Sequence, residues 1–310
     1  MKLHSNSKIA VEQFEHIKNI AISNNKDDGS MDLFLLPING RNFDYNYVSD
    51  NLLESVADYA LSGKIREQYK DKAMILSKKA REKFKNENNN GELGELLLFC
   101  FLEGYLDAPK ILTKLDLKTS NNLYVNGSDG VHLKKISNLK YHLIFGESKT
   151  YKKLTQAFEN AFQSIHDFRN ETNSQGKYKS GINFEKGLIS SHIDQIDFDD
   201  EDKEILSLLV YPGKKSNSNI QLDDAFSIFI GYEIDISEER RKCSNEEFQS
   251  VIKEKIINQI ENYKDEIYNL MEKYELIGYT FYIFIMPFTD IDKNRKIILK
   301  KVCASSVPNI

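Results

Sequence analysis

The sequence predicts an α/β fold with an N-terminal accessory region. Segments with helical spacing of apolar residues and segments with strand-like alternation follow each other along residues 91–300, which is typical of α/β proteins. The chain has 310 residues, of which 40% are hydrophobic, so it is long enough to bury a large core. A polar tract at residues 86–90 suits a linker. We therefore predict an accessory, partner-binding region over residues 1–85 and the main domain over residues 86–310.

In the accessory region, residues 31–38 are apolar and predict a strand. Residues 49–86 have helical spacing, and Gly63 predicts a break into two helices.

The main domain begins with residues 91–106, which are apolar on all sides from Leu96 to Leu102 and predict a buried helix. A strand over 110–119 follows, and then a hairpin over 127–149 with strands at 129–136 and 141–149. Residues 151–171 predict an amphipathic helix. For the rest of the chain we predict a helix or buried turn at 186–193, a strand or short helix at 204–213, strands at 225–234 and 279–288, and one long helix at 245–276.

Composition and charge exclude several classes of protein. The net charge of −5 argues mildly against a self-sufficient DNA-binding protein, although a local basic patch remains compatible with it. The three cysteines are far apart, so neither a disulfide framework nor a structural zinc site is indicated. The N-terminal residues lack the apolar centre of a signal peptide, and we find no stretch of the roughly 18 apolar residues that a membrane helix needs. We expect a protein of the reducing cytoplasm.

The hairpin carries the candidate chemistry. A regular turn centred on Asn138 would place Asp129 opposite Glu147, with Lys149 beside Glu147 on the same face. Two carboxylates this close repel each other unless a cation neutralises them. A hard divalent cation binds carboxylate oxygens, so the pattern points to a metal site. The same alternation puts His132 on the opposite face, and we interpret it as an ordinary covered histidine.

Each of these residues also has a purely structural interpretation. A glutamate and a lysine two apart on a strand are usually a surface ion pair that contributes about 0–1 kcal/mol. Glu92 and Glu95 share a face of the first turn of the helix at 91–106, where acids also favour the helix dipole. The glycines beside the acids, Gly130 and Gly146 among them, would admit a phosphate backbone or form β-bulges.

The order helix, strand, hairpin, helix, strand resembles the PD-(D/E)XK nuclease core, a central mixed sheet flanked by helices. Asp129 matches the Asp of that motif, and Glu147-Ser148-Lys149 matches its (D/E)-x-K. Glu95, or less readily Glu92, matches the additional helix acid of many members. More narrowly, GELGELLL (91–98), SDGVHL (128–133) and IFGESK (144–149) resemble the HamA family, nuclease effectors of the Hachiman anti-phage system.

The resemblance implies metal-dependent DNA cleavage that a helicase partner, HamB, holds in check. Asp129, Glu147 and Glu95 would hold Mg²⁺ or Mn²⁺, and Lys149 would orient water or stabilise the transition state. Activity as a base would require a lowered pKa for this lysine. One metal ion and two are both compatible with the motif.

Residues near the start of the helix at 151–171 are candidates for DNA contact. Lys152 and Lys153 could contact phosphates, and Gln156 or Gln163 could be the helper residue that nucleases of this class often place there. Two other functions compete with the nuclease: a non-catalytic adaptor that binds a partner or DNA, and a sequence-specific restriction endonuclease.

Overall fold

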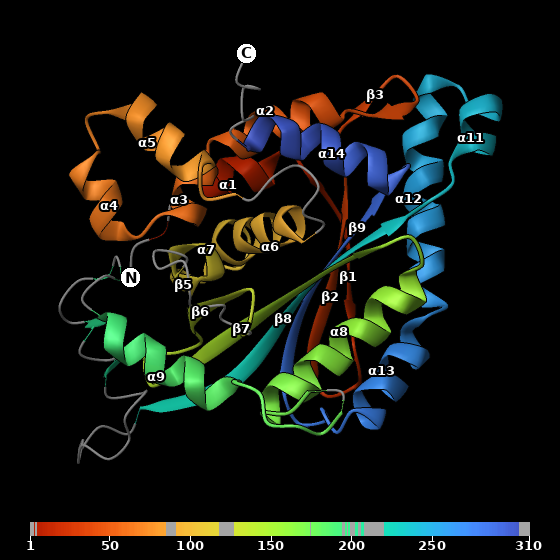
Figure 1. The fold of residues 1–310 in the computed structure, drawn as a ribbon. Helices are drawn as coiled ribbons and strands as arrows, with labels where there is room; N and C mark the ends of the chain where they lie inside the picture. Colours follow the sequence, from red (N-terminus) through yellow and green to blue (C-terminus); the bar gives the residue numbers. More distant parts are fainter. Residues whose placement is uncertain are drawn as a thin grey trace.

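A mixed sheet forms the centre of the molecule in a computed structural model (Figure 1). The structure describes residues 5–84, 91–117, 127–173, 175–193 and 220–303, together with Leu3, Ile196, Phe198, Asp202, Lys203, Leu206 and Ser207. In the described ranges the sheet has seven strands in the order β1-β2-β9-β8-β7-β6-β5. They are β1 (Glu15–Ala21), β2 (Gly29–Leu35), β5 (Lys110–Thr113), β6 (Gly130–Lys135), β7 (Lys140–Tyr151), β8 (Gln221–Glu233) and β9 (Thr280–Phe288).

Four adjacent strands, β2, β9, β8 and β7, are parallel, whereas β1, β6 and β5 pair antiparallel with their neighbours. The short hairpin β3 (Ile38–Asn39) and β4 (Asn42–Phe43) lies apart from this sheet. The described helices are α1 (Ser5–Glu12), η1 (Lys26–Asp28), α2 (Tyr45–Leu53), α3 (Val56–Ala60), α4 (Gly63–Gln68), α5 (Ala73–Arg81), α6 (Glu92–Gly104), α7 (Lys114–Leu117), α8 (Leu154–Arg169), α9 (Ile182–His192), α11 (Ser237–Lys242), α12 (Asn245–Glu261), α13 (Lys264–Lys273) and α14 (Ile291–Val302).

Helices cover both faces of the sheet. Side chains alternate faces along β7, and Phe145 contacts Phe168 of α8, so α8 covers that face. On the other face, Gly94 of α6 lies against Ser148 and Thr150. The arrangement is the mixed α/β architecture that the sequence predicts, and it is compatible with a nuclease-like core.

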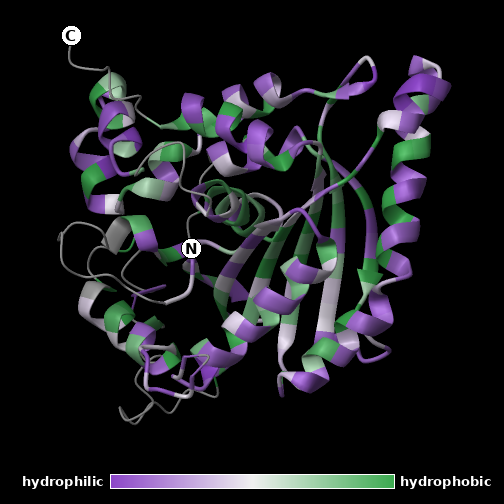
Figure 2. Ribbon diagram, turned by 45° about the vertical axis from the view of Figure 1, so that its right-hand side comes forward, coloured by the Kyte–Doolittle hydropathy of each residue, from purple (hydrophilic) through white to green (hydrophobic). Residues whose placement is uncertain are grey.

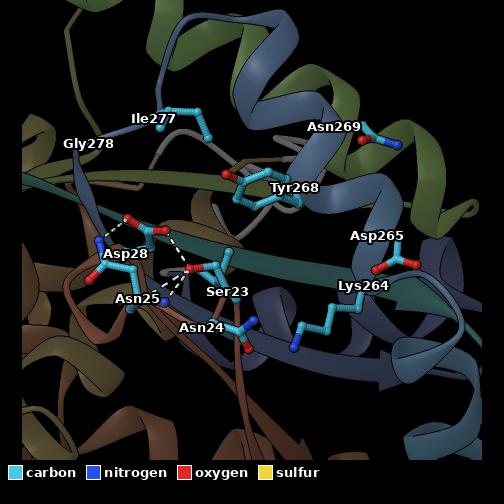
Figure 3. A pocket seen from close by; sticks show the side chains of 11 residues that line it. Ser23, Asn24, Asn25, Asp28, Lys264, Asp265, Tyr268, Asn269, Ile277 and Gly278 are labelled. Atoms are coloured by element: carbon cyan, nitrogen blue, oxygen red, sulfur yellow. Dashed lines mark hydrogen bonds between the residues drawn. The ribbon is translucent and has the colours of Figure 1, made fainter.

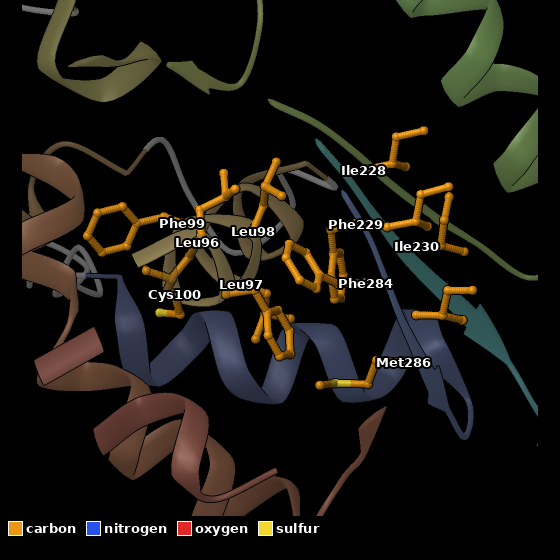
Figure 4. Close-up of a cluster of buried hydrophobic side chains, with 14 of the residues drawn as sticks. Leu96, Leu97, Leu98, Phe99, Cys100, Ile228, Phe229, Ile230, Phe284 and Met286 are labelled. Atoms are coloured by element: carbon orange, nitrogen blue, oxygen red, sulfur yellow. The ribbon is translucent and has the colours of Figure 1, made fainter. Parts of the chain in front are cut away.

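Helix α6 is the centre of the core. Figure 2 shows it as a green, hydrophobic helix surrounded by more polar outer helices. Figure 4 shows Leu97 and Leu98 of α6 next to Phe229 of β8 and Phe284 of β9, whereas Phe99 points away from these strands. Cys100 is a buried core residue, as predicted. The ring of Phe101 stacks on that of Phe284 with centroids 5.1 Å apart. Because apolar residues surround α6, its position relative to β7 and β8 is fixed.

Several predicted elements are confirmed, and several are wrong in extent. The buried helix, the hairpin, the helix after it and the strands at 225–234 and 279–288 are present. The strand predicted at 110–119 ends at Thr113, because Lys114–Leu117 turns into α7. The single helix predicted at 245–276 is two helices, α12 and α13, which separate at residues 262–263 although their buried stripe continues.

Other predictions were incomplete or fall outside the described residues. The two helices predicted over 49–86 are four short ones, and α1, β1 and α14 were not predicted. The ambiguous segment 186–193 lies in α9 and is helical. The prediction for 204–213 falls largely outside the described residues.

The N-terminal region is part of the same sheet. Strand β2 pairs in parallel with β9, with Met31 opposite Ile283, and β1 pairs with β2 at the edge. The boundary predicted at residues 85–86 therefore does not divide the sheet or its core. A partner-binding role for residues 1–85 stays a prediction. Among the described residues, no helix combines the length and the apolar character needed to cross a membrane.

Candidate active site

The hairpin has the predicted register. Val131 pairs with Phe145 and Leu133 with Leu143, so Asp129 and Glu147 lie at the same end of the two strands. The backbone N–H of Asp129 donates to the carbonyl of Gly146 at 2.7 Å, which extends the pairing by one residue. This register brings the candidate acids together.

Asp129 is buried and its carboxylate is fully occupied. Its Oδ2 accepts hydrogen bonds from the backbone N–H of Ser148 at 2.6 Å and from the Ser148 hydroxyl at 2.9 Å. Its Oδ1 accepts from Lys114 Nζ. Burial works against the charge of this carboxylate, but the lysine outweighs it and holds the pKa of Asp129 below its usual range. Asp129 is therefore ionised at neutral pH.

Glu147 and Lys149 lie on one face of β7 and form a partly buried ion pair. Burial raises the pKa of Glu147 above its ordinary value; the lysine opposes this effect and the charge of Asp129 adds to it. Burial also opposes the charge of Lys149, but the attraction of Glu147 outweighs it and raises the pKa of the lysine. Lys149 is therefore an ammonium donor in this arrangement.

Lys114 is a member of the site that the sequence analysis missed. It is the first residue of α7, at the point where the predicted strand instead turns into a helix. Its ammonium contacts Asp129 and lies within electrostatic reach of Glu95 and Glu147. These three carboxylates raise the pKa of Lys114, although burial opposes them. Lys114 thus contacts Asp129, in the loop before β6, and is attracted electrostatically by Glu95 of α6 and Glu147 of β7.

Of the two helix acids, Glu95 faces this cluster. Its Oε2 accepts a hydrogen bond from the Tyr59 hydroxyl at 2.9 Å. Tyr59 is fixed by β5, because Lys110 Nζ donates to three carbonyls at the end of α3, including that of Asp58 at 2.7 Å. Glu92 is more deeply buried and is not among the carboxylates that act on Lys114. The geometry therefore favours Glu95 as the helix acid.

Glu185 of α9 is the second residue that the sequence analysis missed. It is 1% exposed, and its two oxygens contact the backbone nitrogen and the hydroxyl of Ser128, the residue before Asp129. No sequence motif marks it, because its partner is 57 positions away.

His132 is buried on the opposite face of β6, as predicted, and its Nδ1 hydrogen-bonds the carbonyl of Ala108 at 2.8 Å. Gly146 serves close packing: a Cβ there would lie 2.8 Å from Leu98 Cδ2. The close packing accounts for Gly146 without either of the predicted roles, which were to admit a phosphate backbone or to form a β-bulge.

A cavity of about 590 Å³ opens beside the site. Lys149, Lys152, Lys153 and Gln156 line it, together with Arg295 and others from α14. Lys152 is exposed and pairs with Asp292 at 3.2 Å. Gln163 does not line this cavity. It lies seven residues after Gln156 in α8, which corresponds to about 10 Å along the helix axis.

A second cavity, of about 760 Å³, lies between the η1 loop and α13 (Figure 3). Its lining includes the buried Asp28, which accepts hydrogen bonds from Ser23 and Asn25. None of its lining residues is a predicted site residue.

The acids of the site fit a hard divalent cation in charge and in donor type. Asp129, Glu147 and Glu95 offer only oxygen donors, and all three carboxylates act electrostatically on the ammonium of Lys114. In the described residues, no three His, Cys, Asp or Glu side chains lie close enough to hold a metal ion as they stand. Metal binding would thus require the carboxylates to shift away from their lysines.

The fold and this cluster define the class: a mixed α/β protein whose central sheet is compatible with a nuclease-like core and carries a carboxylate–lysine cluster. A family model described as HamA matches residues 10–302, and the chain belongs to the HamA family. Membership implies a role in anti-phage defence. Neither the curated proteins nor the solved structures contain a significant match.

Proposed function

We propose that this protein is a metal-dependent deoxyribonuclease that acts in anti-phage defence. The observation that carries the proposal is the cluster of Asp129, Glu147 and Glu95 around Lys114, whose ammonium contacts Asp129 and is attracted by the other two carboxylates. Three acids that converge from separate elements on one cation are unusual for a surface ion pair, and perturbed carboxylates cluster at functional sites.

Mg²⁺ or Mn²⁺ would be held by Asp129 and Glu147, with Glu95 as the third acid. When bound, such an ion polarises the scissile phosphate and lowers the pKa of water. In the metal-free site the attraction of Glu147 raises the pKa of Lys149, so this lysine is proposed to orient water or to stabilise the negative charge that develops on the phosphate. Ser148 keeps Asp129 oriented through its N–H and hydroxyl.

DNA is the proposed substrate, and the cavity beside β7 is the proposed path of its backbone. Lys152 and Lys153 supply positive charge next to Lys149. Their contribution would be independent of sequence, because phosphate contacts position a strand without reading bases. Gln163 is a weaker candidate, since it lies outside this cavity.

A HamB-like helicase is the proposed partner, and it would keep the nuclease inactive until infection. Residues 1–85 remain the proposed partner-binding region. Met74, which is 89% exposed, and the neighbouring Ile75 support this proposal, since adjacent exposed apolar side chains are typical of a surface that a partner covers.

A plasmid assay tests the chemistry. The purified protein, alone and with its activated partner, should degrade plasmid DNA in Mg²⁺ or Mn²⁺ but not in EDTA. Glu147→Gln and Lys149→Met should each lower the rate at least a hundredfold, whereas Lys273→Met, a surface control, should not. Cleavage retained in either site variant would overturn the site assignment. An absence of cleavage under all these conditions would favour a non-catalytic adaptor, and discrete fragments would favour a restriction endonuclease.

A further inference from the structure

The buried carboxyl group of Glu185 makes two short hydrogen bonds to one residue. Its Oε1 accepts from the backbone N–H of Ser128 at 2.5 Å, and its Oε2 lies 2.6 Å from the Ser128 hydroxyl oxygen. The same hydroxyl oxygen lies 3.1 Å from the carbonyl of Gly130. Helix α9 is anchored independently by Lys186, which pairs with Asp224 of β8 at 2.8 Å.

The contacts between Ser128, Glu185 and Gly130 can be compared with the number of hydrogens available to make them. The Ser128 hydroxyl has one hydrogen but lies within reach of two acceptors, Glu185 Oε2 and the Gly130 carbonyl. If Glu185 is ionised, one of these contacts has no hydrogen. If Glu185 carries a proton on Oε2, that proton is donated to the Ser128 oxygen, and the Ser128 hydrogen goes to Gly130. Only the protonated form makes every contact a hydrogen bond.

The surroundings of Glu185 favour the protonated form below neutral pH. Burial raises its pKa to about 7, although the hydrogen bonds from Ser128 lower it. The charged groups that act on it are Lys114 of α7, which lowers the pKa, and Asp129, which raises it.

We propose that Glu185 is a positioning residue for the active site: it clamps Ser128 and so fixes the loop that presents Asp129. The clamp spans residues 128–130, because Ser128 is held at its nitrogen and its hydroxyl reaches Gly130. Asp129 lies between these two points, with its own N–H bound to Gly146. Helix α9 (green in Figure 1) thereby acts on the site without contributing a ligand. The effect on metal binding rests on the proposed function, whereas the clamp itself does not.

Hydrogen exchange of the Ser128 and Asp129 amides, followed by NMR in metal-free full-length protein, tests the clamp. Glu185→Gln reproduces the protonated acid, since its amide oxygen accepts from Ser128 and its NH₂ donates to the hydroxyl. This variant should exchange as slowly as the wild type at pH 6. Glu185→Ala should exchange at least ten times faster at these two amides. Asn183→Ala, at an exposed position of the same helix, is the matched control and should match the wild type.

Mn²⁺ affinity measured by electron paramagnetic resonance tests the consequence for the site. Glu185→Ala should weaken Mn²⁺ binding about tenfold, which is the lower end of the loss seen when a residue that orients a metal ligand is removed. Glu185→Gln should bind Mn²⁺ within about twofold of the wild-type affinity. Equal exchange in all variants would overturn the proposal, and so would a Gln variant that behaves like Ala. If exchange responds as expected but the wild type binds no Mn²⁺, the clamp stands and the proposed nuclease function falls.

Discussion

At the scale of single residues, two carboxylates of the site are each held by a lysine, Asp129 by Lys114 and Glu147 by Lys149, whereas Glu95 is held by Tyr59. Asp129, Glu147 and Lys149 were predictable from the sequence, because strand alternation and a four-residue turn fix their register. Lys114 was not, because the apolar run from Lys110 suited a longer strand, and only the turn into α7 aims this side chain at Asp129. Glu185 was not predictable either, because it lies 57 positions from Ser128 and no sequence pattern relates two residues so far apart.

Replacing Lys114 with Met should destabilise the metal-free protein by about 3 kcal/mol, because it leaves the buried Asp129 without its ammonium partner. A divalent cation can take over part of that neutralisation. Thermal unfolding with and without Mg²⁺ should therefore give a larger Mg²⁺-dependent rise in Tm for Lys114→Met than for the wild type. The control Lys18→Met breaks an exposed pair with Glu261 and should change stability by less than about 1 kcal/mol. The same Mg²⁺-dependent rise in Tm for the wild type and Lys114→Met would contradict the idea that Lys114 and a divalent cation neutralise the same carboxylates.

The pKa of Glu185 predicts a pH dependence of stability. Its value is raised from the ordinary 4.5 to about 7 in the folded protein, chiefly by burial. Between these values the folded state binds more protons than the unfolded state, so stability falls as pH rises from about 4.5 to 7, by about 3 kcal/mol. Urea unfolding of the wild type and Glu185→Gln across pH 4.5–8 isolates this residue, because other groups cancel in the difference. A difference that stays constant with pH would refute the prediction.

At the scale of elements, the site depends on how closely α6 approaches β7. A Cβ at Gly94 would lie 3.1 Å from both Ser148 Oγ and Thr150 Oγ1, so even one added carbon is tight. Ser148 is the residue that holds Asp129, and Glu95 follows Gly94 in α6. The hydrophobic run predicted α6, but its distance from the sheet depends on tertiary packing that no local pattern encodes.

Gly94→Val should push α6 away from β7 and disturb two of the three acids. We expect a loss of about 1–3 kcal/mol in stability from overpacking, and at least tenfold weaker Mn²⁺ binding. Gly187→Ala, in α9, is the control: a Cβ there meets nothing within 4 Å, so it should be neutral or stabilise by about 0.5–1 kcal/mol. Chemical denaturation and a Mn²⁺ titration measure both effects, and wild-type binding by Gly94→Val would contradict the close-packing argument.

At the scale of the whole molecule, the N-terminal strands complete the sheet that carries the site. The polar tract at 86–90 suggested a boundary, yet β2 pairs with β9 across some 250 residues. Sequence patterns identify strands but not their long-range partners, which explains why the order of the sheet could not be predicted. The local hairpin, in contrast, is determined by residues next to one another.

Deleting residues 1–36 should therefore unfold the protein rather than release an accessory domain. The deletion removes β1 and β2 together with their buried side chains, such as Leu33 and Phe34. It exposes the edge of β9 and uncovers Phe284, which packs against Phe34. Circular dichroism and size-exclusion chromatography should report loss of cooperative unfolding and aggregation. A monomeric, cooperatively folding deletion variant would show that the strands are dispensable.

The parallel pairing of β2 with β9 also constrains when the protein becomes complete during synthesis. The hairpin of β6 and β7 emerges from the ribosome before β8, its parallel neighbour, and β9 is made last of all the strands. Parallel pairs between distant segments form late, since the intervening chain must first be made and closed. A polypeptide released early thus carries the acids and lysines of the site but not the sheet that aligns them. For the nuclease function proposed above, an interrupted translation product would be inactive because the sheet that aligns its site is incomplete.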